Sequence, residues 1–164
     1  MHTNELPPSA MTSHVADSIA QQYVTFDCSE RSYGIDIMSV REIRSWSPTT
    51  ELPGQPHGAK GVLDIRGRVV QVYDLATMLG TTTFAETSKA QVVLVVSLSN
   101  QDVGIVVDTV SDIIFATSDN MRPVPNGGRQ NSGVVSTLVK IEDRLVAVLD
   151  LNALFPDDTT YLLD

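Results

Sequence analysis

The side chains that most often perform chemistry in proteins are few and scattered in this sequence. Its three histidines are His2, His14 and His57, and their spacing matches no metal-ligand pattern. The single cysteine, Cys28, falls on the apolar side of an alternating stretch, where a free thiol usually behaves as a small hydrophobic group. A nucleophilic thiolate would need a base or a cation beside it. These residues therefore predict neither a metal centre nor a thiol active site.

Glycine-rich and acidic stretches also fall short of known catalytic patterns. The stretch 125–129 lacks the Gly-Lys-Ser/Thr ending of a phosphate-binding loop, and no serine lies in a nucleophile-elbow pattern. Four acidic residues have no spacing that requires paired acid–base chemistry: Asp36, Glu42, Asp108 and Asp112. We therefore predict that the protein is not an enzyme and uses no cofactor or metal.

Short strand patterns dominate the chain. Apolar and polar residues alternate through 23–28, and 92–98 is rich in valine, which favours a buried strand. Gly67 lies between two strand patterns, 63–65 and 69–73, which predicts a tight hairpin. The pattern as a whole indicates an all-β protein.

Helical periodicity is weak and short. Asp74 is placed to cap a helix over 75–79 that ends at Gly80. Asp150 is placed to cap a second one over 151–155, which the following proline ends. The two predicted helices each follow the last strand pattern of one half of the chain.

The sequence repeats itself internally. At an offset of 70 residues, Gly34 falls on Gly104 and Val40 falls on Val110. After a few inserted residues the match resumes at an offset of 76. At this offset the dipeptide Asp74-Leu75 aligns with the dipeptide Asp150-Leu151. The order of the glycine and Asp-Leu matches predicts a duplication rather than a chance likeness of two β-rich stretches.

A duplication of this size predicts two small barrels that share an apolar seam, with a groove between them. A domain of about 60 residues buries only about 60% of its unfolded surface and is marginal alone. We expect a mobile N-terminal tail over 1–18 and a domain over 19–157. Within the domain we expect one subdomain at about 20–88 and a second at about 90–156.

Composition and charge exclude several classes of protein. The 164 residues carry a formal net charge of −9, and only 5% are aromatic. An acidic surface repels phosphate backbones and anionic membranes, and single-strand nucleic-acid barrels need a basic face with aromatics. The one cysteine suits a reducing compartment, and no apolar run is long enough to span a bilayer. We predict a cytoplasmic protein without nucleic-acid binding or direct membrane insertion.

Three ordered motifs resemble the signatures of the CheW family of chemotaxis coupling proteins. The first motif comprises Tyr33 to Ile37 and Val40 to Ile43. The second comprises Gly61-Val62, Ile65-Arg66-Gly67, Val69-Val70 and Asp74-Leu75. The third comprises Gly104 to Asp108, Val110, Asp112 and Pro123. The likeness covers about residues 20–156. The sequence departs from the family at Gln71, where the family often has proline.

The resemblance implies two packed SH3-like β-barrels and no enzymatic activity. It also implies that the protein couples the cytoplasmic tips of chemoreceptors to a CheA-type histidine kinase in a chemosensory array. The regulatory domain of that kinase has the same fold and would pack barrel to barrel, whereas the receptor tip, a helical hairpin, would dock near the groove. An adaptor of a non-flagellar chemosensory pathway, for twitching motility or second-messenger output, is the alternative, because the same module serves each.

The resemblance also assigns site residues. Positions implicated in partner contact correspond to Ile37, Val40, Glu42, Arg66 and Ile113. Glycines whose change disturbs function in the family correspond to Gly61, Gly104 and Gly133, where backbone freedom or close approach is the expected role. For the apolar members, a role in the barrel core and a role in an interface both remain open.

Overall fold

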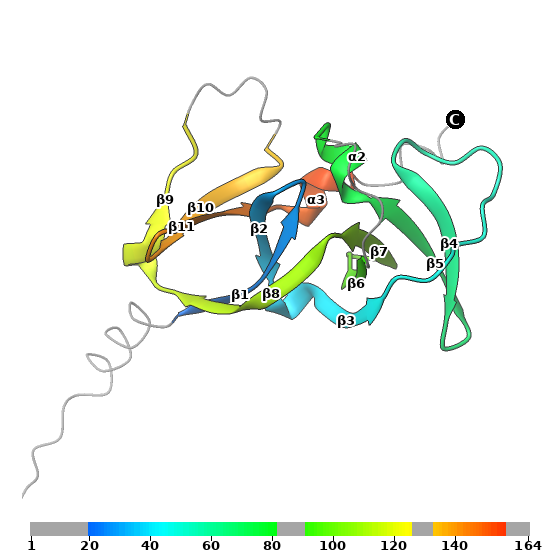
Figure 1. Cartoon of the computed structure of the whole chain (residues 1–164), viewed down its shortest axis with the longest axis horizontal. Coiled ribbons are helices and arrows are strands. Elements are labelled where there is room, and N and C mark those ends of the chain that lie inside the picture. Colours follow the sequence, from blue (N-terminus) through cyan, green and yellow to red (C-terminus); the bar gives the residue numbers. More distant parts are fainter. Residues whose placement is uncertain (1–19, 82–90, 126–132, 157–164) are drawn as a thin grey trace, which may run out of the picture.

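The computed structural model describes residues 20–81, 91–125 and 133–156 (Figure 1). The predicted tail, residues 1–18, lies outside this part of the chain. The first half of the chain forms β1 (Gln21–Cys28), β2 (Arg31–Asp36), the short 3-10 helix η1 (Ile37–Ser39), β3 (Val40–Ser45), β4 (Ala59–Ile65), β5 (Arg68–Asp74) and α2 (Leu75–Leu79). The second half forms β6 (Val92–Ser97), β7 (Asp102–Val107), β8 (Thr109–Ala116), η3 (Ser118–Asn120), β9 (Met121–Arg122), β10 (Val135–Ile141), β11 (Arg144–Leu149) and α3 (Leu151–Leu154).

Local sequence signals account for the turns and the short helices. Arg66 and Gly67 form the two-residue β4–β5 turn, with φ of 56° and 84°, as a hairpin turn that matches strand twist requires. Gly80 ends α2 in the left-handed conformation at φ 73°. The Asp150 side chain accepts hydrogen bonds from the backbone N–H groups of Asn152 and Ala153 at the start of α3. The predicted hairpin and both predicted helices are thereby confirmed. The predicted side-chain cap at Asp74 is wrong, because its carboxylate accepts a hydrogen bond of 2.6 Å from the Thr77 hydroxyl and none from a backbone N–H group of α2.

The strands form two sheets, and each sheet contains strands of both halves of the chain. The first sheet has the order β8-β1-β2-β11-β10-β9, and the second has the order β3-β6-β7-β5-β4. The predicted boundary near residue 89 therefore separates the two sequence repeats but not the two sheets. The reason is that the first two strands of each repeat pair with the later strands of the other repeat, a choice that local patterns do not determine.

The pairing register itself repeats with the offsets found in the sequence. In the first sheet, Phe26 lies opposite Val110; in the second, Val96 lies opposite Val40. The offset of 70 carries one pair onto the other. The parallel pair between β2 and β11 likewise matches that between β7 and β5. The structure is thus two copies of one pairing scheme, as an internal duplication requires.

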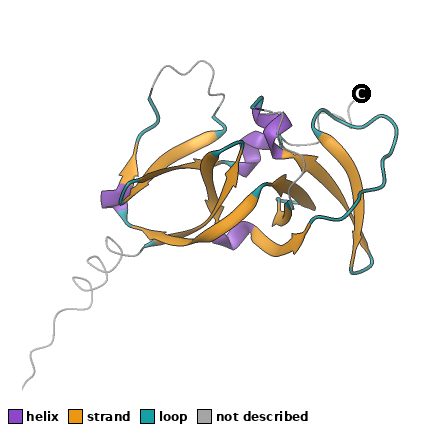
Figure 2. Cartoon of the chain, viewed as in Figure 1, coloured by secondary structure: helices purple, strands orange, loops and turns teal. Residues whose placement is uncertain are grey.

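Both sheets curl until their ends meet, as Figure 2 shows for the ring of strands that contains β1, β2 and β8 to β11. In the first sheet, η3 joins the edge strand β8 directly to β9, which pairs with β10 at the other edge. In the second sheet, the chain beyond β3 returns to β4, where Thr50 and Val62 exchange backbone hydrogen bonds of 2.9 Å. The predicted all-β fold of two small packed barrels is confirmed.

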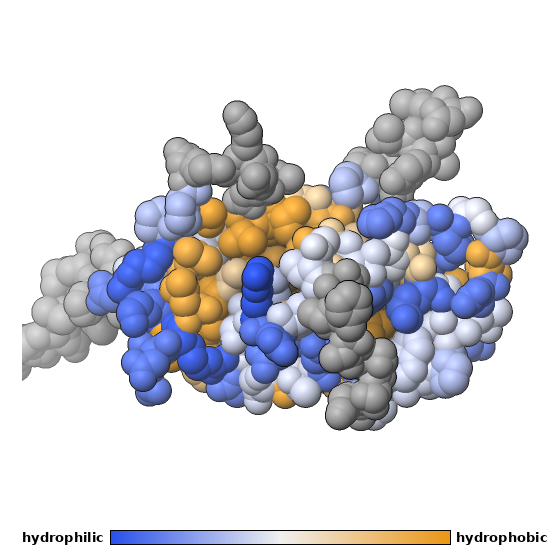
Figure 3. All heavy atoms as spheres, turned by 45° about the horizontal axis from the view of Figure 1, so that its top comes forward, coloured by the Kyte–Doolittle hydropathy of each residue, from blue (hydrophilic) through white to orange (hydrophobic). Residues whose placement is uncertain are grey.

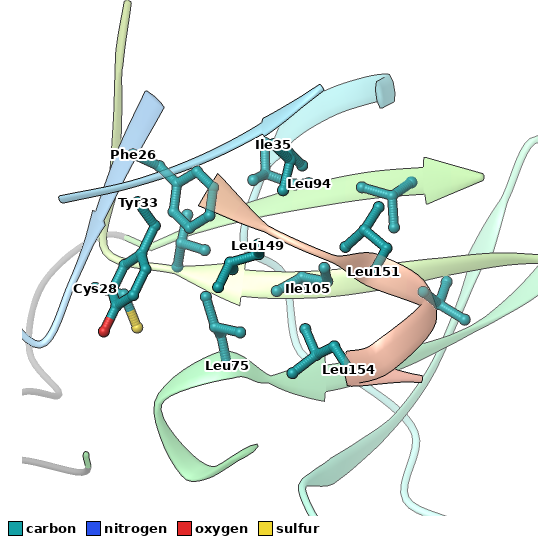
Figure 4. Packing of buried hydrophobic residues seen from close by; sticks show 13 residues of the cluster. Phe26, Cys28, Tyr33, Ile35, Leu75, Leu94, Ile105, Leu149, Leu151 and Leu154 are labelled. Carbon is teal, nitrogen blue, oxygen red and sulfur yellow. The ribbon is translucent and has the colours of Figure 1, made fainter. Parts of the chain in front are cut away.

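The largest apolar cluster lies between the two sheets rather than inside either one (Figure 4). It contains Phe26, Cys28, Tyr33, Ile35, Leu75, Leu94, Val96, Val103, Ile105, Val107, Leu149, Leu151 and Leu154. Two smaller clusters fill the barrels, one around Val72 and Val95 and the other around Val139 and Val146. This central cluster is the apolar seam that the small size of each repeat predicts.

Cys28 belongs to this central cluster, and its surroundings make the thiol hard to ionise. Burial, followed by the negative charge of Asp108, raises the pKa of Cys28 from 9.0 to about 12. The unfolded chain therefore releases the thiol proton above pH 9, whereas the folded chain retains it up to about pH 12. Because the folded state then binds more protons than the unfolded state, stability falls as pH rises through this window.

We expect the melting temperature of the parent protein to fall more steeply between pH 8 and pH 9.8 than that of the Cys28→Ala variant. The comparison concerns the slope with pH, because the smaller side chain also lowers stability at every pH. Circular dichroism melts at five pH values measure both slopes. Parallel declines in the two proteins would mean that Cys28 is not the group responsible.

Candidate partner-binding surface

Two of the residues assigned to partner contact, Glu42 and Arg66, meet although they are far apart in sequence. Glu42 lies on β3 at one edge of the second sheet, and Arg66 lies at the β4–β5 turn at the other edge. Arg66 Nη1 lies 3.5 Å from Glu42 Oε1, and Arg44 Nη1 lies 3.5 Å from Glu42 Oε2. Arg44 was not among the predicted residues. The three charged groups join the two ends of the sheet.

The exposure of these groups leaves them available to a partner. The Arg66 side chain is 77% exposed and the Glu42 side chain 22%. An ion pair at this level of exposure stabilises a fold by less than about 1 kcal/mol. Of the buried side-chain N and O atoms among the described residues, only Arg44 Nε has no hydrogen-bond partner. The network therefore contributes little to stability and leaves most of the Arg66 side chain exposed to solvent.

A β-bulge places Val40 and Glu42 on opposite faces of β3. Two residues separated by one neighbour share a face in a regular strand, which is the sequence-based expectation for this pair. In the structure Val40 lies opposite Val96, but Glu42 lies opposite the adjacent residue Val95, so the extra residue Arg41 resets the alternation. The expectation of a shared face is thus wrong.

Ile43, rather than Glu42, shares the face of Val40. Ile43 lies opposite Leu94, which belongs with Val96 to the central cluster. Val40 is half-buried and packs against that cluster, whereas the Ile43 residue is 48% exposed. This face of β3 thus carries one apolar residue that supports the core and one that is open to a partner.

Ile37 and Ile113 lie away from the charged network. Ile37 is half-buried in η1, immediately before β3. Ile113 lies on β8, the edge strand of the first sheet, and is 47% exposed. In Figure 1, β3 and β8 run along the same lower side of the molecule. The predicted contact residues therefore lie on or next to the edge strands of both sheets and not in one compact site.

The three assigned glycines have different surroundings. Gly61 has φ 127°, and a Cβ there would collide with the carbonyl group of Thr50. A Cβ at Gly104 would lie 3.0 Å from Val93 Cγ1 inside the second sheet. Gly133 has φ 79° in a turn, and a Cβ there would meet no heavy atom within 4 Å. Close approach is therefore present at Gly61 and Gly104 and a positive φ at Gly61 and Gly133, and the importance of all three glycines for function stays a prediction.

Exposed apolar residues recur at equivalent positions of the two repeats, and of the four only Ile113 was assigned to partner contact from the sequence. Ile43 and Ile113 correspond at the offset of 70 and are 48% and 47% exposed. Val69 and Leu145 correspond at the offset of 76 and are 70% and 54% exposed. Figure 3, in which the upper side of Figure 1 comes forward, shows a further group of apolar side chains on that upper side, whereas β3 and β8 with the two isoleucines run along the lower side of Figure 1. The sequence repeat contained the signal for these positions.

The acidic residue that corresponds to Glu42 is held in a similar way in the first sheet. Asp112 follows the equivalent bulge on β8, and its Oδ2 lies 3.4 Å from Arg144 Nη1. The fully buried Thr25 hydroxyl donates to Asp112 and accepts a hydrogen bond of 3.3 Å from Arg144 Nη2. Each barrel therefore joins an edge strand to a hairpin through an acid and an arginine.

The predicted groove between the barrels is present as a cavity of about 500 Å³. Its lining comes from both sheets and from α3: Tyr23, Asp36, Ser39, Ser97, Leu98, Ser99, Ser136, Val148, Leu149, Asp150, Leu151 and Asn152. Burial and the nearby charge of Asp36 raise the pKa of Tyr23, which keeps its hydroxyl protonated. Serines and carboxylates are prominent in the lining, so the cavity offers hydrogen bonds as well as apolar contact.

Other kinds of site find little support in the described residues. Within 20–81, 91–125 and 133–156 there is no group of three or more His, Cys, Asp or Glu side chains that would hold a metal ion. No helix in the same ranges is long and apolar enough to cross a membrane. The notable polar groups instead lie on edge strands and hairpins.

The fold and these positions define a class of protein: a duplicated two-barrel module that exposes equivalent apolar and charged residues on its edge strands. The family model described as CheW-like domain matches residues 22–159, and the chain belongs to this family.

Named relatives and a solved structure agree with this assignment. The chain is 32% identical over 138 residues to "Probable chemotaxis protein CheW" of Rhizobium etli, covering 84% of this chain and 88% of that protein. It is 29% identical over 149 residues to "Chemotaxis protein CheW" of Klebsiella aerogenes, covering 90% and 89%. The crystal structure of the scaffolding protein TtCheW from Thermoanaerobacter tengcongensis has the same fold, with a TM-score of 0.77 at 24% identity, covering 85% of this chain and 95% of that one.

Proposed function

We propose that the protein is a non-enzymatic adaptor that couples the cytoplasmic tips of chemoreceptors to a CheA-type histidine kinase in a chemosensory array. The observation that carries the proposal is the match of the CheW-like family model over residues 22–159. The proposal assigns no reaction and no cofactor to the protein. It places the protein in the cytoplasm, where it is recruited to the array by its partners.

The duplicated architecture supports an adaptor because it offers two separate edges. β3 is an edge strand of the second sheet, and β8 is an edge strand of the first. Both carry an exposed isoleucine and an acidic residue paired with arginine, namely Ile43 with Glu42 and Ile113 with Asp112. Two such edges allow one molecule to hold two partners at the same time.

The chemistry of each edge fits the proposed partners. A kinase regulatory domain with the same fold would pack barrel to barrel, and the exposed isoleucine of an edge strand would supply apolar area to the centre of that interface. A receptor tip is a helical hairpin, which binds by placing apolar anchors of its helices into a groove. The η1–β3 segment contains Ile37 and Val40, and its Ser39 lines the cavity between the barrels. This segment is the region that we assign to the receptor.

Reconstitution tests the proposal directly. Purified kinase, a soluble receptor signalling fragment and the protein are mixed, and sedimentation detects the ternary complex while phosphate transfer measures kinase activity. We expect the receptor fragment to control the kinase only when the protein is present. If the protein binds neither partner at micromolar concentrations, the proposed function is wrong.

Arg66 is expected to act in binding rather than in stability. The Arg66 side chain is 77% exposed, so its truncation costs the free protein little stability. In a complex, however, a partner carboxylate or carbonyl can accept hydrogen bonds from several N–H groups of its guanidinium. Arg66→Ala should weaken the ternary complex about tenfold and change the free energy of unfolding by less than about 1 kcal/mol.

Arg68 provides the matched control for this variant. It is exposed on the same hairpin but makes no ion pair with Glu42. Arg68→Ala should leave the ternary complex intact. Titration by fluorescence anisotropy and urea unfolding measure the two properties. An unfolded Arg66→Ala protein, or equal losses in both variants, would show that Arg66 has no specific role in recognition.

Val40 is expected to contribute more to receptor binding than Glu42. Truncating a central apolar contact typically costs about 2 kcal/mol, or about thirtyfold in affinity. A charge at the rim acts mainly on the association rate and the salt dependence. Val40→Ala should therefore weaken receptor binding more than Glu42→Gln, and Glu42→Gln should show the larger change with salt.

Ile43→Ala separates the binding role of this face from its role in the core. Val40 packs against the central cluster, so its truncation also lowers the melting temperature. Ile43 lies on the same face and is 48% exposed, so its truncation should weaken receptor binding with little loss of stability. Calorimetric titration and thermal melts measure each variant. Unchanged receptor affinity in all three folded variants would remove β3 from the receptor site.

A further inference from the structure

We infer that the two halves of this chain are interchangeable between molecules, so that two copies form a half-exchanged dimer in which each two-barrel unit combines residues 20–81 of one copy with residues 91–156 of the other. The interaction surface is the one that each half presents to its complement, and the partner is a second copy of this chain. This inference is independent of the proposed function, because it concerns how the halves recognise each other.

Strand pairing between the halves is extensive, although it is less extensive than the pairing within them. Four pairs join the first half to the second: β1 with β8, β2 with β11, β3 with β6, and β5 with β7. Among the described residues, β3 has only β6 as a strand partner. Neither half therefore contains a complete sheet of its own, and each carries open strand edges that the other half satisfies.

The apolar clusters are shared in the same way. The central cluster takes Phe26 and Ile35 from the first half and Leu94, Ile105 and Leu151 from the second, all at most 9% exposed. Both barrel clusters also contain residues of each half. Separating the halves would expose all three clusters together, so each half has a strong preference for a complementary half.

The contacts of a half do not depend on which molecule supplies the complement. An exchanged dimer makes the same strand pairs and the same apolar contacts per unit as the monomer, and it differs from the monomer in which chain supplies each half. The monomer is favoured by the high effective concentration of a tethered half, and this advantage decreases as protein concentration rises during refolding. Exchange should therefore occur when chains refold together at high concentration.

Complementation between two disrupted full-length chains tests the inference. Ile35 in the first half and Val139 in the second are both fully buried. Ile35→Asp and Val139→Asp each bury an uncompensated carboxylate, so neither chain should fold by itself. In an exchanged dimer of the two, one unit receives both substitutions and the other receives none.

The two variants are unfolded in urea, mixed and refolded together by dilution at high concentration. Light scattering coupled to size exclusion gives the mass, and circular dichroism follows melting. We expect a species of twice the chain mass that melts cooperatively near the parent temperature. Neither variant refolded alone should produce it.

Pairing Ile35→Asp with Phe26→Asp provides the matched control. Both substitutions lie in the first half, so every unit of an exchanged dimer contains one of them and no intact unit forms. The inference is overturned if the Ile35 and Val139 variants give no folded species on mixing. It is also overturned if the control pair is rescued equally, since rescue would then not depend on exchange of halves.

Discussion

Replacing Gly61 by alanine is expected to destabilise the fold by about 3–5 kcal/mol, because steric overlap with rigid backbone and unfavourable dihedral angles act at the same residue. Gly61 has φ 127°, a conformation that L-amino acids rarely adopt. A Cβ at this residue would overlap the carbonyl group of Thr50 and lie 3.0 Å from Thr49 Oγ1. None of these atoms belongs to the far end of a flexible side chain.

The overlap would affect the contact that closes the second sheet. Thr50 and Val62 exchange two backbone hydrogen bonds, and the Thr49 hydroxyl donates to the Lys60 carbonyl over 2.7 Å. The Gln71 side chain also donates to the Gly61 carbonyl over 2.8 Å. A methyl group would push the segment at Thr50 away from β4 and break these bonds together, which is why the expected loss exceeds that of an ordinary surface substitution.

Gly67→Ala separates the two contributions. Gly67 also has a positive φ, 84°, but a Cβ there would meet no heavy atom within 4 Å. Its replacement should therefore cost only the conformational part, about 1–2 kcal/mol. Urea unfolding at constant pH measures both variants. If the two substitutions cost equal free energy of unfolding, close approach to Thr50 is not the reason that residue 61 is glycine.

The sequence predicted those features that depend on neighbouring residues. A two-residue turn at Gly67, the end of α2 at Gly80 and the start of α3 at Asp150 each follow from the conformational preference of a few adjacent residues. The internal repeat predicted two similar units with a shared seam. The structure adds that the offset also relates exposed residues, because Ile43 and Ile113 have nearly the same exposure.

Features that depend on distant residues were not predictable in the same way. Exchange of strands between the repeats leaves every local sequence pattern unchanged. The sequence of either half alone therefore does not distinguish this exchanged arrangement from one in which each repeat forms a separate barrel. The bulge at Arg41 arises from register with β6 and places Val40 and Glu42 on opposite faces. Glu42 and Arg66 were each predicted as contact residues, but their pairing with Arg44 follows only from how the second sheet curls.

The strand exchange leads to the second large effect: the fragment 20–88 is expected not to fold. Within it, β1 loses β8, β2 loses β11, β5 loses β7, and β3 loses its strand partner β6. What remains is the β1–β2 hairpin and the β4–β5 hairpin. Isolated two-stranded hairpins are marginally stable at best in water.

The apolar surface of the fragment reinforces this expectation. Phe26, Ile35 and Leu75, each fully buried in the whole chain, would lose the second-half residues of the central cluster. Their exposure favours aggregation over a folded monomer. Circular dichroism and gel filtration of residues 20–88 should show no cooperative melting transition, while the full chain melts in one step. A fragment that melts cooperatively would mean that the first half contains a sufficient core, and the shared seam would then not be the reason that the two repeats remain joined in one chain.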